Sequence, residues 1–197
     1  MSEITELYLV RHGETIWNSE GKLQGHLDSP LSKQGILQAQ QLSERLKNED
    51  FDQLYSSSTR RAVKTAEIIQ RTRTQNIILK DSLRELNLGD WEGLKTTEAQ
   101  AKDPDNYFCF WNEPHNFQPP GGENVIDLQK RVVKTIEEIT FKHPGEKILI
   151  VSHTLALRSF LCFIQKMPLK ELWNAPKLNP ASLTILKLKA GVFKIDL

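Results

Sequence analysis

Hydrophobic residues occur along the chain in two patterns, short continuous runs and sets with helical spacing. Residues 7–10 and 147–152 form nearly continuous apolar runs, which are typical of strands buried on both faces of a sheet. Further strands are predicted at residues 51–57 and 77–79, with a closing hairpin at 183–188 and 192–195.

Helical spacing predicts helices between these strands. The first spans residues 32–48, and Ser32 is a suitable N-cap for it. Leu42 and Leu46 lie four residues apart and so share one face. The other helices are expected at residues 59–71, from 125 to about 143, and at 155–165.

Residues 86–120 differ from the rest of the chain. They are rich in aromatic residues, Asn and Pro, and residues 119–122 read PPGG. Gly and Pro mark turns and loops, and loops carry many binding functions. We therefore interpret residues 86–122 as an inserted lid of irregular structure.

Strands alternate with helices for most of the length. This order predicts an α/β fold with a mostly parallel sheet covered on both faces. A chain of 197 residues suits one domain, residues 1–197. In such folds ligands bind beyond the carboxyl ends of the strands.

Composition narrows the choice of partners and compartment. The formal net charge is +1, so no overall field favours nucleic acid or an anionic membrane. The two cysteines form no disulfide framework, and Cys162 suits a core position. The first apolar run begins too early for a signal peptide, and no apolar run is long enough to cross a bilayer. We expect a cytoplasmic protein.

Basic groups follow three of the predicted strands. Arg11 and His12 end the first strand, Arg60 and Arg61 begin the helix after the second, and His153 follows residues 147–152. Each alone has an ordinary explanation, a capped histidine or a solvated arginine. Together at one sheet edge they would repel one another without a bound anion. The set predicts an anion site.

The segment LVRHGET, residues 9–15, resembles the Arg-His-Gly signature of the histidine phosphatase superfamily. The tripeptide Arg-His-Gly alone is weak evidence for this family. The resemblance, however, continues in order through almost the whole chain. The further blocks are Ser56-Ser57 with Arg61-Ala62 and Thr65-Ala66, Leu83-Arg84-Glu85 with residues 89–93 (GDWEG), residues 120–123 (PGGE), and Val151-Ser152-His153. The resemblance implies a phosphoglycerate mutase-like fold, a three-layer α/β/α sandwich with a small lid.

The resemblance also implies roles for five residues. His12 matches the histidine that is phosphorylated, and Glu85 matches the proton donor. Arg11, Arg61 and His153 match the residues that hold the phosphate.

The roles of four positions near these five residues are less certain from the sequence pattern. Asn18 and the amide near Thr15 are expected at the pocket rim. Thr154 stands where the family usually has Gly, and its amide could still face the phosphate. Spacing to the following Ala and Thr favours Arg61 over Arg60 as the phosphate ligand.

Two alternatives to Glu85 as the catalytic proton donor remain open. Glu85 could be a surface carboxylate paired with Arg84, and Glu14 is a second candidate acid. The place of Glu14 in a loop favours hydrogen bonds to its neighbours instead. We rank Glu85 first.

The chemistry expected from these residues is transfer of a phosphoryl group to an imidazole. Guanidinium groups would neutralise the phosphate oxygens, and the other ring nitrogen of His12 would donate to a backbone carbonyl. No cofactor and no metal are implied, because His26, His115 and His143 are scattered and form no ligand set. The partner is a small phosphorylated molecule.

Hydrolysis and transfer to a second hydroxyl remain as alternatives. Residues 86–120 hold Lys95 and Lys102 against six acidic residues, together with six aromatic ones. An acidic, aromatic lid suits a monophosphate on an apolar group better than a bisphosphate, although any of these aromatics could simply anchor the lid. We predict a phosphoric monoester hydrolase, with a phosphoglycerate mutase-type phosphotransferase and an alpha-ribazole-phosphate phosphatase as alternatives. The hairpin at 183–195 would allow a homodimer.

Overall fold

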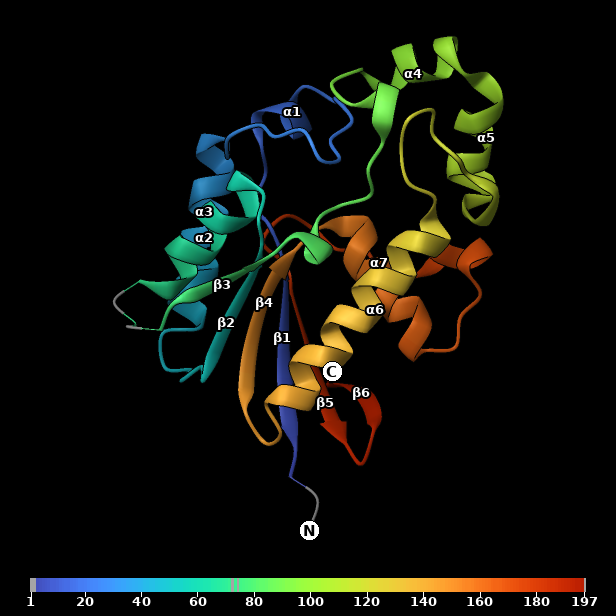
Figure 1. Cartoon of the computed structure of the whole chain (residues 1–197). Coiled ribbons are helices and arrows are strands. Elements are labelled where there is room, and N and C mark those ends of the chain that lie inside the picture. The colour runs from blue at the N-terminus through green and yellow to red at the C-terminus, as the bar shows by residue number, and fades with distance from the viewer. Residues whose placement is uncertain (1–2, 72, 74, 197) are drawn as a thin grey trace.

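The computed structural model describes residues 3–71, 73 and 75–196. Within these residues the strands form one six-stranded sheet with the order β3-β2-β4-β1-β5-β6 (Figure 1). The strands are β1 Thr5–Arg11, β2 Gln53–Ser57, β3 Ile77–Lys80, β4 Lys147–Ser152, β5 Leu183–Lys189 and β6 Val192–Asp196.

Strands β1 to β4 run parallel, and the last two strands are antiparallel. Strand β4 lies between β1 and β2, and β3 extends the parallel part. Strand β5 pairs antiparallel with β1, and β6 with β5. The mostly parallel sheet and the closing hairpin predicted from the sequence are both confirmed.

The carboxyl ends of three parallel strands meet at one sheet edge. Arg11 lies opposite Ser152 in the β1–β4 register. Ser56 lies opposite Val151 in the β2–β4 register. The residues that follow β1, β2 and β4 therefore emerge side by side.

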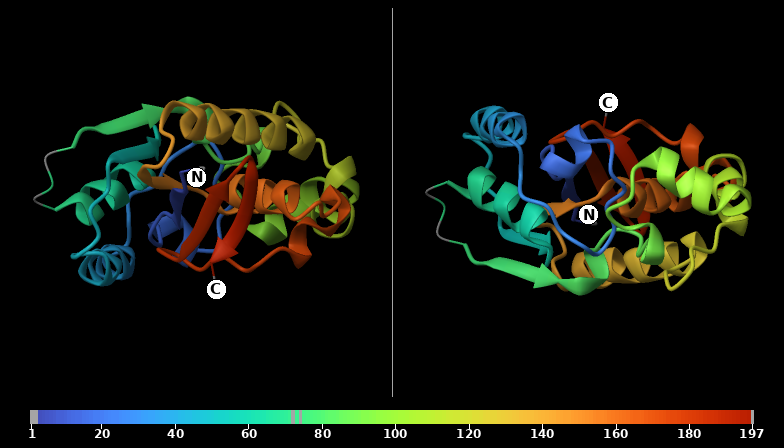
Figure 2. Two further views of the ribbon diagram at one scale, coloured as in Figure 1. Left: turned by 90° about the horizontal axis from the view of Figure 1, so that it is seen from below. Right: turned by 90° about the horizontal axis from the view of Figure 1, so that it is seen from above.

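Two helical layers cover the sheet (Figures 1 and 2). Side chains alternate along β1, so Leu7 and Leu9 pack under the α6–α7 layer while Tyr8 and Val10 pack under the α2–α3 layer. This is the three-layer α/β/α sandwich. The helices are α1 Ile16–Ser19, α2 Lys33–Arg45, α3 Arg60–Gln70, α4 Thr96–Lys102, α5 Pro104–Asn112, α6 Val125–Lys142 and α7 Thr154–Ile164.

Local capping explains where the long helices begin. The Ser32 hydroxyl accepts a hydrogen bond from Gly35 N at 3.0 Å, as predicted for the start of α2. The Asn124 side chain accepts from Asp127 N at 2.8 Å at the start of α6. Each such cap stabilises a helix by about 1 kcal/mol.

The lid is more regular than the sequence suggested. Its irregular structure was predicted wrongly, because α4 and α5 lie within it, above the carboxyl edge of the sheet (Figure 1). Asp103 caps α5 by accepting from Asn106 N at 3.3 Å, and Pro104 occupies the first turn. These helices are short and carry few core residues, so hydrophobic spacing gave little sign of them.

Aromatic side chains hold the lid together. Trp91 is fully buried, and its ring lies 5.0 Å from Phe117 and 6.0 Å from Phe110, centroid to centroid. These rings anchor the lid, which was the alternative reading of the aromatic residues.

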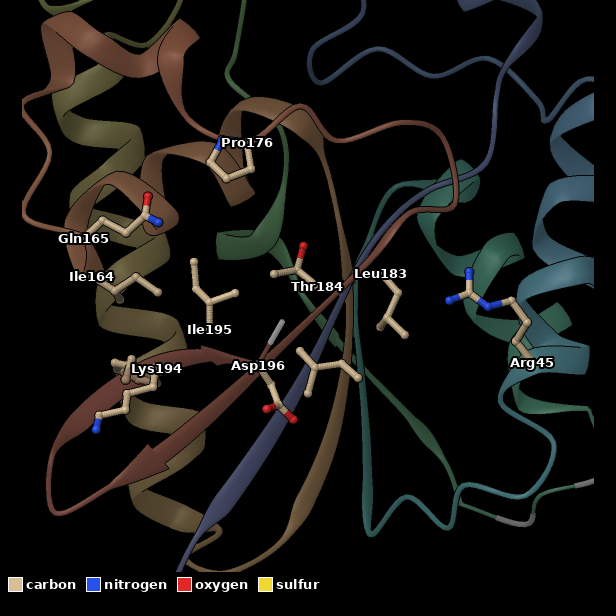
Figure 3. A pocket seen from close by; sticks show the side chains of 11 residues that line it. Arg45, Ile164, Gln165, Pro176, Leu183, Thr184, Lys194, Ile195 and Asp196 are labelled. Atoms are coloured by element: carbon tan, nitrogen blue, oxygen red, sulfur yellow. The ribbon is translucent and has the colours of Figure 1, made fainter.

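A groove of about 800 Å³ lies between the hairpin, the end of α7 and α2 (Figure 3). Ile164, Leu183 and Ile185 form part of its wall, with Arg45 at one side.

No helix of the described residues is long and apolar enough to span a membrane.

Candidate active site

The structure brings the predicted site residues to the carboxyl edge of the sheet. Arg11 ends β1 and His12 follows it, while Arg61 lies in the first turn of α3. His153 is the N-cap of α7, directly after β4. The ring centroids of His12 and His153 are 5.0 Å apart.

A cavity of about 270 Å³ opens at this point. Arg11, His12, Asn18, Glu85 and Thr154 are among the residues that line it. Arg61 and His153 lie behind this lining and are 1% and 0% exposed. The remaining lining residues are Lys22, Leu23, Gln24, Leu88, Thr96, Phe110, Trp111, Leu155 and Trp173.

His12 is held as a neutral ring with one free nitrogen. Its Nδ1 donates to the carbonyl of Gly13 at 2.7 Å, because a carbonyl can only accept. Burial, and then the charges of Arg61 and Arg11, hold the pKa of His12 well below its usual value. Nε2 therefore keeps its lone pair, as nucleophilic attack requires.

His153 is oriented by hydroxyl groups from the end of β2. Its Nε2 lies 2.8 Å from Ser57 Oγ and 3.3 Å from Thr59 Oγ1. Burial first, and then the charge of Arg61, lower the pKa of His153 well below the usual value. The ring is neutral in the ligand-free site, and only a bound anion would favour its charged form.

Arg61, and not Arg60, is buried close enough to His12 and His153 for its charge to lower the pKa of both. Its Nη2 donates to Gly25 O at 2.6 Å, and its Nη1 donates to Leu27 O and Asp28 Oδ1, each at 3.0 Å. Burial lowers the pKa of Arg61, and the Asp28 carboxylate opposes that shift. Arg60 is exposed.

Three buried nitrogens of these residues lack a partner. Arg11 Nε, Arg61 Nε and His153 Nδ1 have no hydrogen-bond partner among the described residues, although Arg11 Nη1 donates to Leu178 O at 2.7 Å. A buried unsatisfied donor costs about 1–3 kcal/mol. Oxygen atoms of a bound anion would satisfy the two guanidinium Nε–H groups, and also His153 Nδ1 when it carries the ring proton, and a tetrahedral oxyanion such as phosphate is the simplest such group.

Glu85 is buried beside the start of α7. Its carboxylate accepts from Leu86 N, Leu155 N and Ala156 N, each at 3.0 Å. The alternative that pairs it with Arg84 is wrong, because Arg84 instead contacts Asp81 at 2.9 Å. Glu85 also lines the cavity.

Glu14 faces away from this chemistry. It accepts a hydrogen bond from the Ser32 hydroxyl at 2.6 Å, which joins the loop after β1 to the start of α2. The role of hydrogen-bonding to neighbours, expected for Glu14, agrees with this contact.

The two positions expected at the pocket rim differ in the structure. Thr15 N donates to Asn18 Oδ1 at 3.1 Å within the cap of α1, and Thr15 is not among the residues that line the cavity. Asn18 itself lines the cavity, and so does Thr154 at the first position of α7.

Sequence reasoning missed several lining residues, of which Lys22, Gln24 and Trp173 bear most on ligand binding. Lys22 and Gln24 come from the loop after α1, and Trp173 comes from the 3₁₀ segment Leu169–Asn174. The Trp173 ring lies 4.6 Å from that of Trp111, so a segment after α7 completes the aromatic wall of the lid. No motif marks these positions, because only tertiary packing brings them to the cavity.

Gln24 adds a further free donor. Its Oε1 accepts from the Thr15 hydroxyl at 2.8 Å, and its Nε2 is buried without an acceptor among the residues that the structure describes. This amide group therefore suits an oxygen of a bound ligand.

Histidines outside the site do not assemble into a metal centre. His143 contacts the Tyr55 hydroxyl at 2.9 Å and Glu146 at 2.9 Å. Across residues 3–71, 73 and 75–196, no group of three His, Cys, Asp or Glu side chains has a metal-binding arrangement.

Comparison with known proteins gives consistent matches. The sequence profile of the histidine phosphatase superfamily (branch 1) matches residues 7–197. The chain is 35% identical over 198 residues to the metal-independent phosphoserine phosphatase of Arabidopsis thaliana, covering 99% of this chain and 81% of that protein. It is 33% identical over 171 residues to phosphoserine phosphatase 1 of Hydrogenobacter thermophilus, covering 87% and 81%. The solved structure of YhfR from Bacillus stearothermophilus superposes with a TM-score of 0.95 at 38% identity, covering 98% of this chain and 96% of that one.

Proposed function

The chain belongs to the histidine phosphatase superfamily (branch 1), and on that basis we propose that it hydrolyses small phosphate monoesters without a metal ion, with His12 as nucleophile. One observation carries the proposal. A neutral imidazole with a free Nε2 stands beside three buried nitrogens, Arg11 Nε, Arg61 Nε and His153 Nδ1, that have no hydrogen-bond partner among the described residues.

In the first step His12 takes the phosphoryl group. The arginines and His153 neutralise the phosphate oxygens, which lowers the repulsion that a nucleophile meets. The Nε2 lone pair of His12 forms the bond to phosphorus as the ester P–O bond breaks. The leaving alkoxide takes a proton from the carboxyl group of Glu85, and such acid catalysis contributes about 10²–10⁴-fold.

In the second step water releases the phosphate. The Glu85 carboxylate takes a proton from water, and the water oxygen bonds to phosphorus as the N–P bond breaks. The products are inorganic phosphate, neutral His12 and protonated Glu85, so the cycle closes.

The cavity suggests the class of leaving group. Leu88, Phe110 and Trp173 contribute apolar surface to the lining, and Lys22 and Gln24 contribute polar groups. A cavity of about 270 Å³ suits a small alcohol that bears an anionic group within reach of Lys22. Phosphoserine is therefore our first candidate substrate, in line with the names of two relatives.

Hydrolysis is favoured over phosphoryl transfer to a second hydroxyl. A mutase must hold a second anionic group throughout the transfer. Lys22 is the one cationic side chain besides Arg11 that lines the cavity among the described residues. The lid itself contributes no cation to that lining.

A phosphomonoester panel tests the proposal. Purified protein should release inorganic phosphate from phosphoserine and para-nitrophenyl phosphate, with no loss of rate in EDTA. Alpha-ribazole phosphate and 3-phosphoglycerate are assayed in parallel, the latter for mutase activity. A large loss in EDTA, or mutase turnover faster than hydrolysis, would contradict the proposal.

We also propose the setting in which the activity operates. The chain acts as one domain over residues 1–197 with a lid at about 86–122, in the cytoplasm, on free small molecules and not on nucleic acid or membrane. The net charge of +1 supports this choice of ligand.

A homodimer through the hairpin is part of the same proposal. Strand β6 is an edge strand, and Val192 on it is 57% exposed. Unpaired edge strands can pair with another chain. Sedimentation equilibrium tests this, and a monomer at all concentrations would contradict it.

A further inference from the structure

Arg61 is held in place by one short loop, residues 25–28. Its two terminal nitrogens donate to the carbonyls of Gly25 and Leu27 and to the Asp28 carboxylate. Asp28 also accepts from Arg60 N. The direction in which Arg61 Nε points is therefore set by where this loop lies.

The same loop is bound from its other side by Glu92, which follows the 3₁₀ turn Gly89–Trp91 of the lid. Its Oε1 accepts from His26 N at 2.8 Å, and its Oε2 accepts from Leu27 N at 2.5 Å. Oε1 also accepts from Leu88 N at 3.0 Å, which joins the loop to the lid backbone.

One peptide unit connects the two charged groups directly. The carbonyl of Gly25 and the N–H of His26 belong to the same peptide bond, and no peptide bond of the described residues is cis. In a trans unit these groups point in opposite directions. Glu92 therefore accepts from one end of this unit while Arg61 donates to the other, and charged groups at both ends polarise the two hydrogen bonds.

Close packing fixes the loop against the lid. A Cβ atom at Gly25 would lie 2.3 Å from Glu92 Oε1 and 2.4 Å from Leu86 O, so only glycine fits. Leu23 pairs with the chain after Glu92 on both sides, because Gly93 N donates to Leu23 O at 2.9 Å and Leu23 N donates to Leu94 O at 2.8 Å.

We propose that Glu92 is a positioning residue that couples the lid to the phosphate-binding Arg61 through the peptide units of residues 25–27. Glu92 touches no substrate in this role. It fixes the loop carbonyls that aim Arg61 Nε at the phosphate position. The inference rests on the proposed function, in which Arg61 binds the phosphate.

The first test is Glu92→Gln with phosphate affinity as the readout. Gln keeps the size of the side chain but puts an amide N–H group against a backbone N–H. Because the loop amides lose a charged acceptor and the loop no longer fixes Arg61, the inhibition constants of vanadate and inorganic phosphate should rise about tenfold or more. KM should rise more than kcat falls.

Glu98→Gln is the matched control. Glu98 lies in the same lid and accepts from Lys95 N at 2.7 Å, but it has no contact with residues 25–28 among the described contacts. Its inhibition constants should stay within about twofold of the wild type. Glu92→Asp, which keeps the charge but is too short, should behave like Glu92→Gln and replaces it if that variant does not fold.

A double-mutant cycle with Arg61→Ala separates positioning from a general structural effect. In the Arg61→Ala background, or Arg61→Lys if the former does not fold, Glu92→Gln should change vanadate inhibition by less than about twofold. The same loss in both backgrounds, or no loss in the single variant, would overturn the coupling. Unchanged phosphate affinity in Arg61→Ala would instead overturn the proposed function.

Discussion

The ring centroids of His12 and His153 lie 5.0 Å apart, and each ring is held by a hydrogen bond through one of its two nitrogens. His12 Nδ1 donates to Gly13 O, and His153 Nε2 contacts Ser57 Oγ. Both rings are therefore oriented before a substrate arrives, and neither needs to reorganise during the reaction.

This pair predicts a dependence of stability on pH. Burial and the nearby arginines lower the pKa of both rings well below 6.5. Below the unfolded-state pKa of about 6.5 the unfolded chain takes up protons that the folded chain does not. The free energy of unfolding should therefore fall as the pH drops below that value, by up to about 1.4 kcal/mol per pH unit for each ring.

Urea unfolding of the ligand-free protein between pH 7.5 and pH 5.5 measures this dependence. His12→Asn removes one of the two rings and should make the slope shallower. An unchanged slope would show that His12 titrates normally.

Glu85→Gln should slow hydrolysis according to the leaving group. With phosphoserine, whose alkoxide needs a proton, kcat/KM, which reports the first step, should fall about 10²–10⁴-fold. Para-nitrophenolate leaves without that help, so the loss of kcat/KM with para-nitrophenyl phosphate should be much smaller. An acid-labile phosphoenzyme should accumulate, because the second step, common to both esters, also lacks the Glu85 carboxylate. The values of kcat/KM for both substrates measure the difference.

Glu14→Gln is the control for the acid, since Glu14 contacts Ser32 and not the cavity. Equal losses of kcat/KM with both esters in Glu85→Gln would mean that Glu85 is not the proton donor.

Lys22→Met should raise KM for phosphoserine but not for para-nitrophenyl phosphate, because only phosphoserine has a charged leaving group that Lys22 can bind. Lys22 lines the cavity and pairs with Glu20 at 2.8 Å at its rim. A partly exposed ion pair contributes up to about 1 kcal/mol, so KM for phosphoserine should rise about threefold to fivefold. KM for para-nitrophenyl phosphate, which has no carboxylate, should not change.

Lys33→Met is the matched control, because Lys33 is exposed on α2. If Lys22→Met raises KM equally for both esters, the leaving-group contact assigned to Lys22 is wrong.

The sequence predicted the strands and helices of the sandwich and several residues that line the candidate site, among them Arg11, His12 and Glu85. Strands such as Lys147–Ser152 are continuous apolar runs, and their parallel order follows from the helices between them. The order of motifs around His12 and His153 then selected the residues at the strand ends.

Tertiary contacts account for what the sequence left out. Helix α4 buries only Ala99, so its hydrophobic pattern was too weak to predict it. Trp173 reaches the cavity from a segment after α7, and Glu92 acts on amides more than sixty residues away, at 26 and 27. Hydrogen bonds to distant backbone leave no periodic signal in a single sequence.

The central claim is that His12 carries the phosphoryl group. It is tested most directly by rapid acid-free quenching during turnover of phosphoserine, followed by peptide mass spectrometry under alkaline conditions. The account predicts an acid-labile phosphoryl group on the peptide that contains His12, and neither that group nor turnover in His12→Ala. Phosphorylation at another residue, or full turnover by His12→Ala, would contradict it.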